Sequence, residues 1–502
     1  MIDLLNPFNI AKNKQSDNTV KCLRLFELCD EAATRGFRSI PPIVKKELSE
    51  LTNDLPTLKF RSDFAAELYY KRDICEKIRE AYTEIGEYLK LSEAYDAMDN
   101  HKYAETALNI ILIKKLLEIE KLISVEGKSE CLRMLQKTFN FCDNEEFKQF
   151  RLEVEQHTGS IDRFSSVYIN VSPEVGMRKR VEITDSSGNV GIESTVSSYL
   201  ERLGVIQTEE TGAPWFTMYS GFELAVLEAL DSKYDISGEY STKFRTKCES
   251  VLYAVHKGLS FYLFMQSIYE HWNEVGLSVC APEYNDNSLN SFHGLYDPIL
   301  LKESPEVIIP NDFEFSDECG FVLSGANSSG KTSFLRAVGT AFALAGCGCL
   351  ISAKSACVSP MNAIYTHFPQ GETVNFGFGR LKTEIEILQG FLKNDPKNSL
   401  FLFNEIFSST NGDDAYIYTK RLTAYLIRNN AYFILISHHK TIPPRLFADG
   451  STARLAFLTT NVLDTKYIVR RVNSPENYEN ESILEEYGLS AEQLKTGGQK
   501  ND

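Results

Sequence analysis

The first 165 residues carry apolar side chains at three- and four-residue spacing, with charged side chains between them. Residues 63–89 and 103–123 keep this spacing over their whole length, and Asp63 stands where the N-cap of the first run is expected. Such spacing places the apolar side chains on one face of a helix. Proline, which interrupts helices, is sparse here. We therefore predict a helical, core-like domain over residues 1–165.

The pattern changes twice between residues 166 and 284. Residues 165–171 (SSVYINV) alternate between polar and apolar positions as a strand does, and residues 184–191 have the composition of a turn. Residues 243–272 then form one long amphipathic run. We predict a strand-containing connector and long, lever-like helices over residues 166–284.

From about residue 285 onward, short apolar runs alternate with helical segments. The runs expected to form strands are residues 320–324, 400–404 and 432–437. This alternation predicts an α/β domain over residues 285–490, with a mostly parallel sheet and flanking helices. Residues 491–502 are polar, and we expect them to form a disordered tail.

Composition limits the class of protein without identifying a function. The 502 residues are 43% apolar and 24% charged, as in an ordinary multi-domain soluble protein. A net charge of −16 argues against a surface coated with nucleic-acid-binding groups, although a local basic channel is compatible with it. The 11 cysteines include no C-x-x-C pair and no signal peptide is apparent, so we expect reduced thiols and a cytoplasmic protein.

Residues 337–353 (AVGTAFALAGCGCLISA) form the most membrane-like stretch of the chain. The stretch is rich in Gly and Ala and only marginally long enough to cross a bilayer. It also follows a glycine-rich motif directly. We expect a buried helix and no membrane association.

That glycine-rich motif is the strongest chemical signal in the chain. Gly325, Gly330, Lys331 and Thr332 match G-x-x-x-x-G-K-[ST], between an apolar strand and a helix expected to begin at Lys331. The glycines let backbone N–H groups converge on a polyphosphate, while the lysine contacts the β- and γ-phosphates and the threonine binds magnesium. The helix N-terminus adds a positive dipole end. The alternative, a glycine-rich turn without a ligand, is disfavoured by the strand and helix on either side. The residues expected to bind ATP are Gly325, Ala326, Asn327, Ser328, Ser329, Gly330, Lys331, Thr332 and Ser333.

Two further segments are expected to complete a nucleotide site. Asn404 and Glu405 end an apolar run where nucleotide-hydrolysing proteins commonly have Asp-Glu. Glu405 is placed to polarise an attacking water, and Thr332, Asn404 and Glu405 are the expected magnesium ligands; a capping or surface role is the alternative for Glu405. His438 and His439 follow another apolar run, where one of them could sense the γ-phosphate or serve a structural role.

These motifs resemble the ATPase domain of the MutS family of DNA mismatch repair proteins. SGANSSGKTSFLRAVGTAFALAGCGCLISA is similar to the family's P-loop region, and GLYDPIL and IIPNDFEF resemble the stretches before it. NEIFSSTNGDD resembles the family's Walker B and dimer-contact segment, where Glu405, Thr410 and Asp414 match. In LISHH, His438 rather than His439 matches the family's histidine. The resemblance extends over about residues 290–445.

The chain departs from the family pattern at several positions. Asn404 replaces the Walker B Asp, and Ser409 replaces a Gly. Asn375 stands where a Ser crosses the dimer interface, and Arg380 replaces a Glu. Mismatch-reading members carry a Phe-x-Glu wedge, and no Phe-x-Glu occurs in the first 300 residues.

The resemblance implies a dimer, either a homodimer, which we expect, or a heterodimer with a relative. It places Asn375 and Asp414 at the contact and implies ATP and Mg²⁺ as cofactors. The expected function is ATP binding, with weak ATPase activity, coupled to dimer closure and DNA binding in repair or recombination without mismatch reading. One alternative is an ATP-regulated interaction protein of the same fold whose partner is not DNA, which the acidic charge favours. Another P-loop enzyme, such as a kinase, is disfavoured because the match extends well beyond the P-loop.

Overall fold

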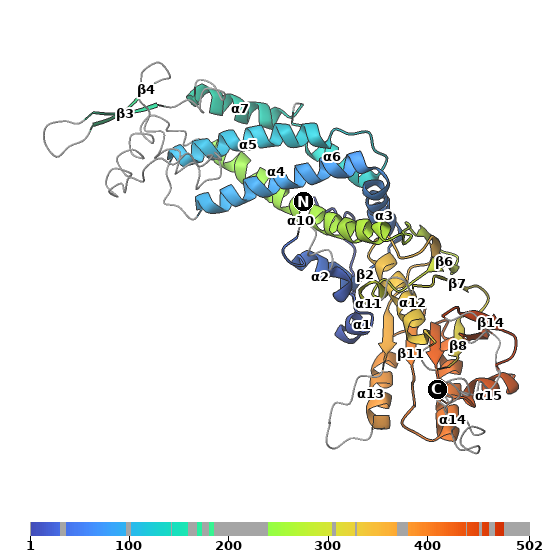
Figure 1. The fold of residues 1–502 in the computed structure, drawn as a ribbon. Coiled ribbons are helices and arrows are strands. Elements are labelled where there is room, and N and C mark those ends of the chain that lie inside the picture. Colours follow the sequence, from blue (N-terminus) through green and yellow to red (C-terminus); the bar gives the residue numbers. More distant parts are fainter. Residues whose placement is uncertain are drawn as a thin grey trace, which may run out of the picture. The chain divides into compact units, whose positions relative to one another are not determined.

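The amphipathic runs of the sequence form long helices, and the short apolar runs form a sheet, in the computed structural model of the protein (Figure 1). The structure describes residues 2–30, 37–96, 102–141, 143–158, 168–172, 180–184, 239–303, 308–326, 329–368, 380–437, 439–450, 454–460 and 467–475. The chain divides into a helical unit, residues 1–4 and 70–260, and a sheet unit, residues 5–69 and 261–502. The domain boundaries predicted at residues 165, 284 and 490 stay predictions, and the expected tail 491–502 lies outside the described residues.

Long helices lie side by side in the helical unit (Figure 1). Glu249 of α10 (Glu239–Glu274) accepts hydrogen bonds from the hydroxyls of Tyr88 at 2.9 Å and Ser92 at 2.7 Å, and these bonds join two helices of the bundle. The amphipathic run 243–272 is confirmed as a helix. The elements of the unit are α4 (Arg72–Asp96), α5 (Lys102–Ile123), α6 (Glu130–Thr138), α7 (Glu145–Thr158), the antiparallel pair β3 (Tyr168–Ser172) and β4 (Arg180–Thr184), and the first part of α10 (Glu239–Glu274).

The helix expected to start at Asp63 begins earlier, so the N-cap prediction is wrong. Asp63 lies inside α3 (Leu55–Tyr70), and only Lys71 separates this helix from α4. The cap is Asp54, whose carboxylate accepts a hydrogen bond from the Thr57 N–H at 2.9 Å. A carboxylate that satisfies a free N–H of the first turn is the usual N-cap interaction. The apolar spacing of this region therefore belongs to two helices rather than one.

An N-terminal segment, residues 5–69, belongs to the sheet unit. Its α1 lies against the edge strand β10 (Ile364–His367). There the Asn18 amide donates to the Thr366 carbonyl at 2.9 Å, and the Thr19 hydroxyl donates to the Ile364 carbonyl at 3.0 Å. Side chains thus satisfy a strand edge that would otherwise be open to pairing with another chain. The segment contains β1 (Asn13–Lys14), α1 (Asp17–Cys22), the 3₁₀ helix η1 (Glu27–Cys29), α2 (Pro42–Leu48), β2 (Glu50–Leu51) and most of α3.

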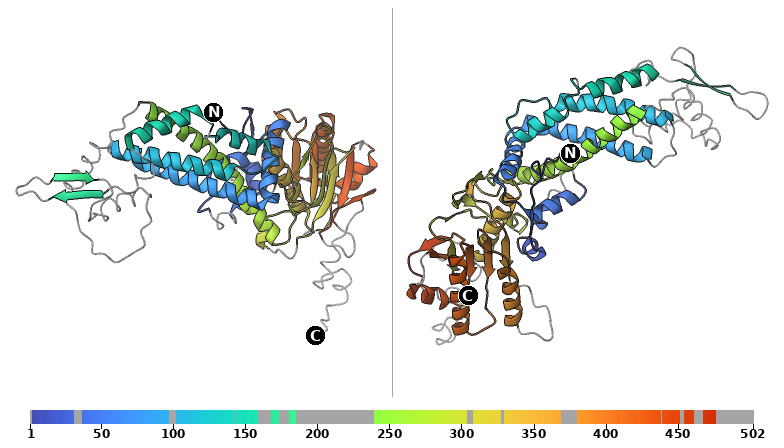
Figure 2. Two further views of the ribbon diagram at one scale, coloured as in Figure 1. Left: turned by 90° about the horizontal axis from the view of Figure 1, so that it is seen from above. Right: turned by 180° about the vertical axis from the view of Figure 1, so that it is seen from behind.

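A β-sheet forms the centre of the sheet unit (Figure 2). It has six strands in the order β10-β11-β12-β8-β13-β14. The first five strands pair in parallel, and β14 pairs antiparallel with β13. The predicted strands are confirmed, with β12 ending one residue earlier than expected. The remaining strands are β8 (Gly320–Ser324), β11 (Leu400–Asn404), β12 (Tyr432–Ile436), β13 (Leu455–Thr459) and β14 (Arg470–Val472).

Helices cover both faces of this sheet, as expected for a parallel sheet whose strands are apolar on both sides. One face packs in a core with α13 (Arg380–Leu392), α14 (Gly412–Arg428) and α15 (Ile442–Ala448). Alternate strand residues such as Phe403 and Leu435 enter this core. The other face meets α12 (Lys331–Gly346). The mixed helix and sheet architecture with a parallel sheet is therefore confirmed.

A smaller sheet of order β5-β9-β6-β7 completes the unit. Its central strand β6 pairs antiparallel with β7 and β9, and β5 extends the sheet in parallel beside β9. The hydroxyl of Tyr432 in the larger sheet donates to the Ser288 carbonyl at 3.0 Å, just before β6. The bounds are β5 (Glu283–Tyr284), β6 (Asn290–Leu295), α11 (Leu300–Glu303), β7 (Asn311–Phe315) and β9 (Ser355–Val358).

The Gly- and Ala-rich stretch that follows the phosphate motif is buried as α12 and the turn after it. A side chain at Gly339 would lie 2.5 Å from Leu23 and 2.6 Å from Leu402, and one at Gly346 would lie 2.7 Å from Leu51. The small residues therefore allow a strand and the N-terminal segment to approach the helix closely. Among the described residues, no helix is long and apolar enough to cross a bilayer.

The close contact at Gly339 makes a testable prediction. Gly339→Ala forces Leu23 and Leu402 apart, and overpacking of this kind costs about 1–3 kcal/mol. The matched change Gly390→Ala lies in α13, where an added methyl meets nothing within 4 Å. It is expected to stabilise the helix by up to about 1 kcal/mol. Thermal unfolding scans should show a lower apparent Tm for Gly339→Ala only; an unchanged Tm for that variant contradicts the packing described.

Candidate functional site

The loop between β8 and α12 brings the predicted phosphate-binding residues to the carboxyl edge of the sheet. Gly325 and Gly330 have φ angles of 144° and 89°, which favour glycine. Gly330 directly precedes the first residue of α12, Lys331, as the motif predicts. Asn327 and Ser328 lie outside the described residues. The other predicted residues, Gly325, Ala326 and residues 329–333, lie between the end of β8 and the first turn of α12.

Two residues not identified from the sequence line this loop. A side chain at Gly325 would lie 2.1 Å from the Thr460 hydroxyl, and one at Gly330 would lie 3.0 Å from the Tyr467 ring. Ser329 donates to the Ala326 carbonyl at 2.7 Å and also forms a hydrogen bond with Thr460. Thr460 follows β13, which pairs in parallel with β8. The apolar run 455–459 was the signal in the sequence that could have indicated Thr460.

Lys331 turns its ammonium back over the loop. Its Nζ donates to the Gly325 carbonyl at 2.9 Å and to the Ala326 carbonyl at 2.6 Å. Burial lowers the pKa of Lys331 below the ordinary lysine value, while the Glu405 carboxylate acts in the opposite direction. The lysine is thus a partly desolvated cation at the N-terminus of a helix, a setting that attracts an anion.

Asn404 and Thr332 meet across the edge of the sheet. Asn404 ends β11 and lies in one row with Ile436 of β12, which pairs with Leu323 of β8. Its Nδ2 donates to the Thr332 hydroxyl at 3.3 Å, while its buried Oδ1 has no hydrogen-bond partner among the described residues. The structure therefore brings together two of the three predicted magnesium ligands.

Glu405 follows directly in a left-handed conformation, with a φ of 55°. Its N–H donates to the Ile436 carbonyl at 2.9 Å. Phe407 is also left-handed, with a φ of 59°. Such angles are uncommon in residues other than glycine and are often found at functional sites. The chain thus turns sharply at the residue that is expected to polarise water.

Of the other predicted site residues, the structure describes only Asp414. His438 and Asn375 lie outside the described residues. Asp414 is at the start of α14, where its N–H donates to Asn411 Oδ1 at 2.9 Å and its carboxylate accepts from Asn411 Nδ2 at 2.7 Å. This contact is a helix cap, and a role of Asp414 in a dimer stays a prediction. Ser409, one of the departures from the family pattern, lies 3.5 Å from the buried carboxylate of Glu384.

The residues present fit magnesium and a nucleoside triphosphate. The two glycines leave a backbone cradle that a Cβ would fill, and Lys331 lies over it. The Asn404 Oδ1 atom is a buried oxygen acceptor to which no described residue donates, and the Asn404 amide contacts the Thr332 hydroxyl. Magnesium prefers oxygen ligands and usually keeps several waters, to which an amide oxygen can accept hydrogen bonds. Asn404 contributes no charge, however, so the donor set is weaker than one with a carboxylate.

Similarity to known proteins lies in this same part of the chain. Residues 321–494 match the family described as MutS domain V. The DNA mismatch repair protein MutS of Aquifex pyrophilus is 27% identical over 141 residues, which are 28% of this chain and 16% of the relative. Msh3 of Dictyostelium discoideum is 26% identical over 143 residues, which are 28% of this chain and 10% of the relative.

A third relative, MutS of Chlorobium chlorochromatii, is 26% identical over 168 residues, which are 33% of this chain and 19% of the relative. The chain thus matches between 10% and 19% of the length of these three curated relatives. The resemblance inferred from the motifs is confirmed over the C-terminal region.

Because the ammonium group of Lys331 is partly buried, its removal is expected to raise the stability of the protein. Because the pKa of Lys331 is lower in the folded protein, the unfolded chain binds the proton more tightly, and the charge reduces the free energy of unfolding at neutral pH. Lys331→Met is expected to raise the apparent Tm at pH 7. The gain should shrink as the pH approaches 10.5, because the wild-type lysine then loses its proton.

The matched control is Lys420→Met, which removes a lysine from an exposed ion pair with Asp449 and should leave the Tm nearly unchanged. Thermal scans at pH 7 and above test both variants. A Tm for Lys331→Met that is lower than that of wild type at pH 7 would show that Lys331 stabilises the fold, contrary to this prediction.

Proposed function

We propose that this chain, which is a MutS-type family member through its C-terminal region, binds MgATP at residues 325–333 and couples that binding to dimer closure and DNA binding. It would act in DNA repair or recombination. The relatives are DNA mismatch repair proteins, but this chain has no Phe-x-Glu in its first 300 residues. We therefore propose that it binds DNA without reading mismatches.

The observation that carries the proposal is the contact between Asn404 and Thr332, within the region that matches MutS domain V. It joins the end of β11 to the start of α12, beside the glycine loop. Parallel α/β sheets bind ligands at the carboxyl ends of their strands, where these two elements meet. A helix N-terminus with converging backbone N–H groups and a lysine suits a polyphosphate.

Each residue of the site has a distinct role in this proposal. Lys331 would leave the loop carbonyls to contact the phosphates, and the loop N–H groups would hold their oxygens. Thr332 and Asn404 would hold magnesium, directly or through its waters, and Glu405 would orient the attacking water. Bound magnesium would neutralise part of the phosphate charge. His438 would sense the γ-phosphate.

The amide of Asn404 makes us propose weak ATPase activity. A carboxylate at this position would attract the metal by charge, whereas an amide offers only a dipole and a hydrogen-bond acceptor. ATP binding depends mostly on the loop and on Lys331 and should be retained. In this chain, ATP binding rather than rapid turnover would control the conformation of the dimer.

A second candidate function is favoured by the net charge of −16. An acidic protein is repelled by the phosphate backbone unless a basic channel lies where the nucleic acid binds. In the alternative, ATP binding drives dimerisation through the sheet units, and the partner is a protein rather than DNA. The two candidates share the nucleotide site and differ only in the partner.

Binding to plain, branched and mismatched duplexes, with and without MgATP, separates these candidates. The proposed function predicts ATP-dependent binding that does not favour the mismatch and weakens by at least about tenfold between 50 and 200 mM salt. Lys331→Met is the control that should lose the ATP dependence. ATP-dependent dimerisation in light scattering, without DNA binding at either salt concentration, would support the alternative.

Restoring the missing carboxylate tests the role assigned to Asn404. Asn404→Asp is expected to raise ATP hydrolysis by at least about tenfold, or about 1.4 kcal/mol in activation free energy, because a charge then holds the metal. A carboxylate at this buried position should also make the Tm rise more strongly with added Mg²⁺. Glu405→Gln in the same background should abolish the gain. Unchanged hydrolysis in an Asn404→Asp variant that binds MgATP would contradict the role of residue 404.

A further inference from the structure

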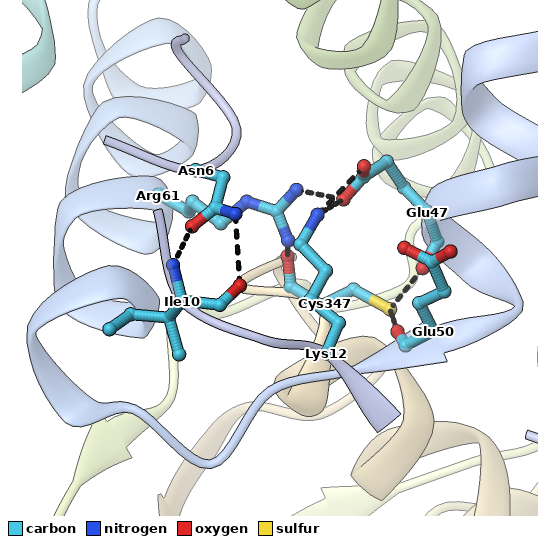
Figure 3. Close-up of polar contacts among 7 residues, drawn as sticks. All are labelled: Asn6, Ile10, Lys12, Glu47, Glu50, Arg61 and Cys347. Carbon is cyan, nitrogen blue, oxygen red and sulfur yellow. Dashed lines mark hydrogen bonds and ion pairs between the residues drawn. The ribbon is translucent and has the colours of Figure 1, made fainter. Parts of the chain in front are cut away.

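A buried ionic cluster lies at the C-terminal end of α12, at the opposite end of the helix from Lys331. Figure 3 shows its side chains and their contacts. Arg61 of α3 forms an ion pair with Glu47 of α2, and both side chains are almost completely buried. Glu47 also accepts hydrogen bonds from Lys12 at 2.6 and 2.8 Å. The second guanidinium nitrogen of Arg61 donates to the Cys347 carbonyl at 2.7 Å. The N-terminal segment thus supplies every charged group of this cluster.

The cluster has a surplus positive charge, and that charge faces the negative end of a helix dipole. Lys12 and Arg61 outnumber Glu47, and Cys347 is the C-cap residue of α12. Burial disfavours the ionised carboxylate, yet Arg61 and Lys12 hold the pKa of Glu47 below its ordinary value. The cluster is therefore charged at neutral pH. A cation at a helix C-terminus interacts favourably with the unpaired carbonyls there.

Other contacts leave the end of α12 little freedom. The Thr52 N–H donates to the Gly346 carbonyl at 3.0 Å, and the Cys347 thiol donates to the Glu47 carbonyl at 3.1 Å. Gly348 is left-handed, with a φ of 71°, and a side chain there would lie 2.5 Å from Arg61 Cβ. The helix end and the arginine therefore fit each other by shape as well as by charge.

The loop that carries Lys12 is also held in place. Asn6 and Ile10 exchange two hydrogen bonds, from Asn6 Nδ2 to the Ile10 carbonyl at 2.9 Å and from the Ile10 N–H to Asn6 Oδ1 at 2.8 Å (Figure 3). A closed loop at this point presents Lys12 to Glu47 in a fixed geometry. The turn therefore precedes by two residues the lysine that contacts Glu47.

Stability alone does not explain a buried cluster of this kind. Removing charges from water costs free energy, and well-packed apolar side chains of the same volume are often equally stabilising or better. Charged groups, in contrast, impose directional bonds and so define a position. Here the directional bond ends on α12, a helix of 16 residues and about 24 Å. Most of its residues are buried, so a displacement at one end is carried to the other.

We propose that Arg61 is a positioning residue for the phosphate-binding end of α12. Its guanidinium, oriented by Glu47, fixes the position of the helix along its axis, and this sets where Lys331 and Thr332 lie relative to Asn404. The inference rests on the proposed nucleotide binding. It assigns to the N-terminal segment a part in a site that the segment does not touch among the described residues.

An apolar replacement of the whole cluster separates positioning from folding. The triple variant Lys12→Met, Glu47→Met and Arg61→Met keeps the buried volume but removes the bond to the Cys347 carbonyl. It is expected to unfold at nearly the wild-type Tm and to bind MgATP about five- to tenfold more weakly, measured by displacement of a fluorescent ATP analogue. The affinity of the triple variant for AMP, which lacks the β- and γ-phosphates, should fall much less than its affinity for ATP.

Two further variants keep the test decisive if the triple variant does not fold. Arg61→Lys retains the charge beside Glu47 but lacks the planar fork that also reaches the Cys347 carbonyl, and it should reproduce the selective loss of ATP affinity. Lys420→Met removes a lysine from an exposed ion pair outside the cluster, and it is the control that should bind ATP as wild type does.

Wild-type ATP affinity in a folded triple variant, or in folded Arg61→Lys, overturns the positioning role. An equal loss of ATP and AMP affinity also overturns it, because that result indicates general loosening of the fold. Failure of the wild-type protein to bind MgATP overturns the proposed function itself, and with it this inference.

Discussion

Close approach of the chain to α12 is the constraint on which the rest of the sheet unit depends. The helix is in contact with strand β11 through Leu402 and with the N-terminal segment through Leu23, both at Gly339. It can meet both because it has no side chain there. The lack of a side chain at Gly346 likewise lets Leu51 pack closely against the helix. Cys347 and Gly348, which follow, contact Arg61. The Gly- and Ala-rich composition of residues 337–353 is therefore explained by the close packing of α12 against both β11 and the N-terminal segment. Small residues are needed wherever backbones come close.

The candidate site follows from that fixed helix and from the order of the sheet. Strand β12 lies between β8 and β11, and Leu323, Ile436 and Asn404 are paired in one row across these three strands. The glycine loop after β8 and the side chain of Asn404 therefore lie at the same edge of the sheet, one strand apart. The left-handed turn at Glu405 then directs the chain away from the strand just beyond the row. Thr460 closes the other side because β13 also ends beside β8. Parallel strands thus bring together residues that lie far apart in the sequence, as at the carboxyl edge of other α/β sheets.

The sequence predicted those parts of the fold that depend on local pattern. The strands 320–324 and 400–404 and the start of α12 at Lys331 were predicted correctly, because apolar runs and a glycine motif mark them. The N-cap at Asp63 was wrong because the apolar spacing continues through the break at Lys71, and the cap at Asp54 precedes a proline-containing first turn. The pairing of Arg61 with Glu47 and Cys347 has no signal in one sequence, since it joins residues up to 286 positions apart. Tyr467 was not identified either, because its position beside Gly330 also joins residues that lie far apart in the sequence.

The amide at Asn404 changes the charge of the site as well as its metal ligands. Lys331 is the cation proposed to contact the phosphates, and Glu405 is close enough to affect its pKa. With Asp at position 404, two neighbouring carboxylates would face one lysine, and a nucleotide could approach only with a metal to offset them. With Asn, the side-chain amide donates a hydrogen bond to Thr332 and adds no negative charge beside Glu405. Under the proposed function, the chain keeps the glycine loop and the lysine that attract an anion but lacks one carboxylate that would bind a metal. This combination is expected where nucleotide binding matters more than turnover.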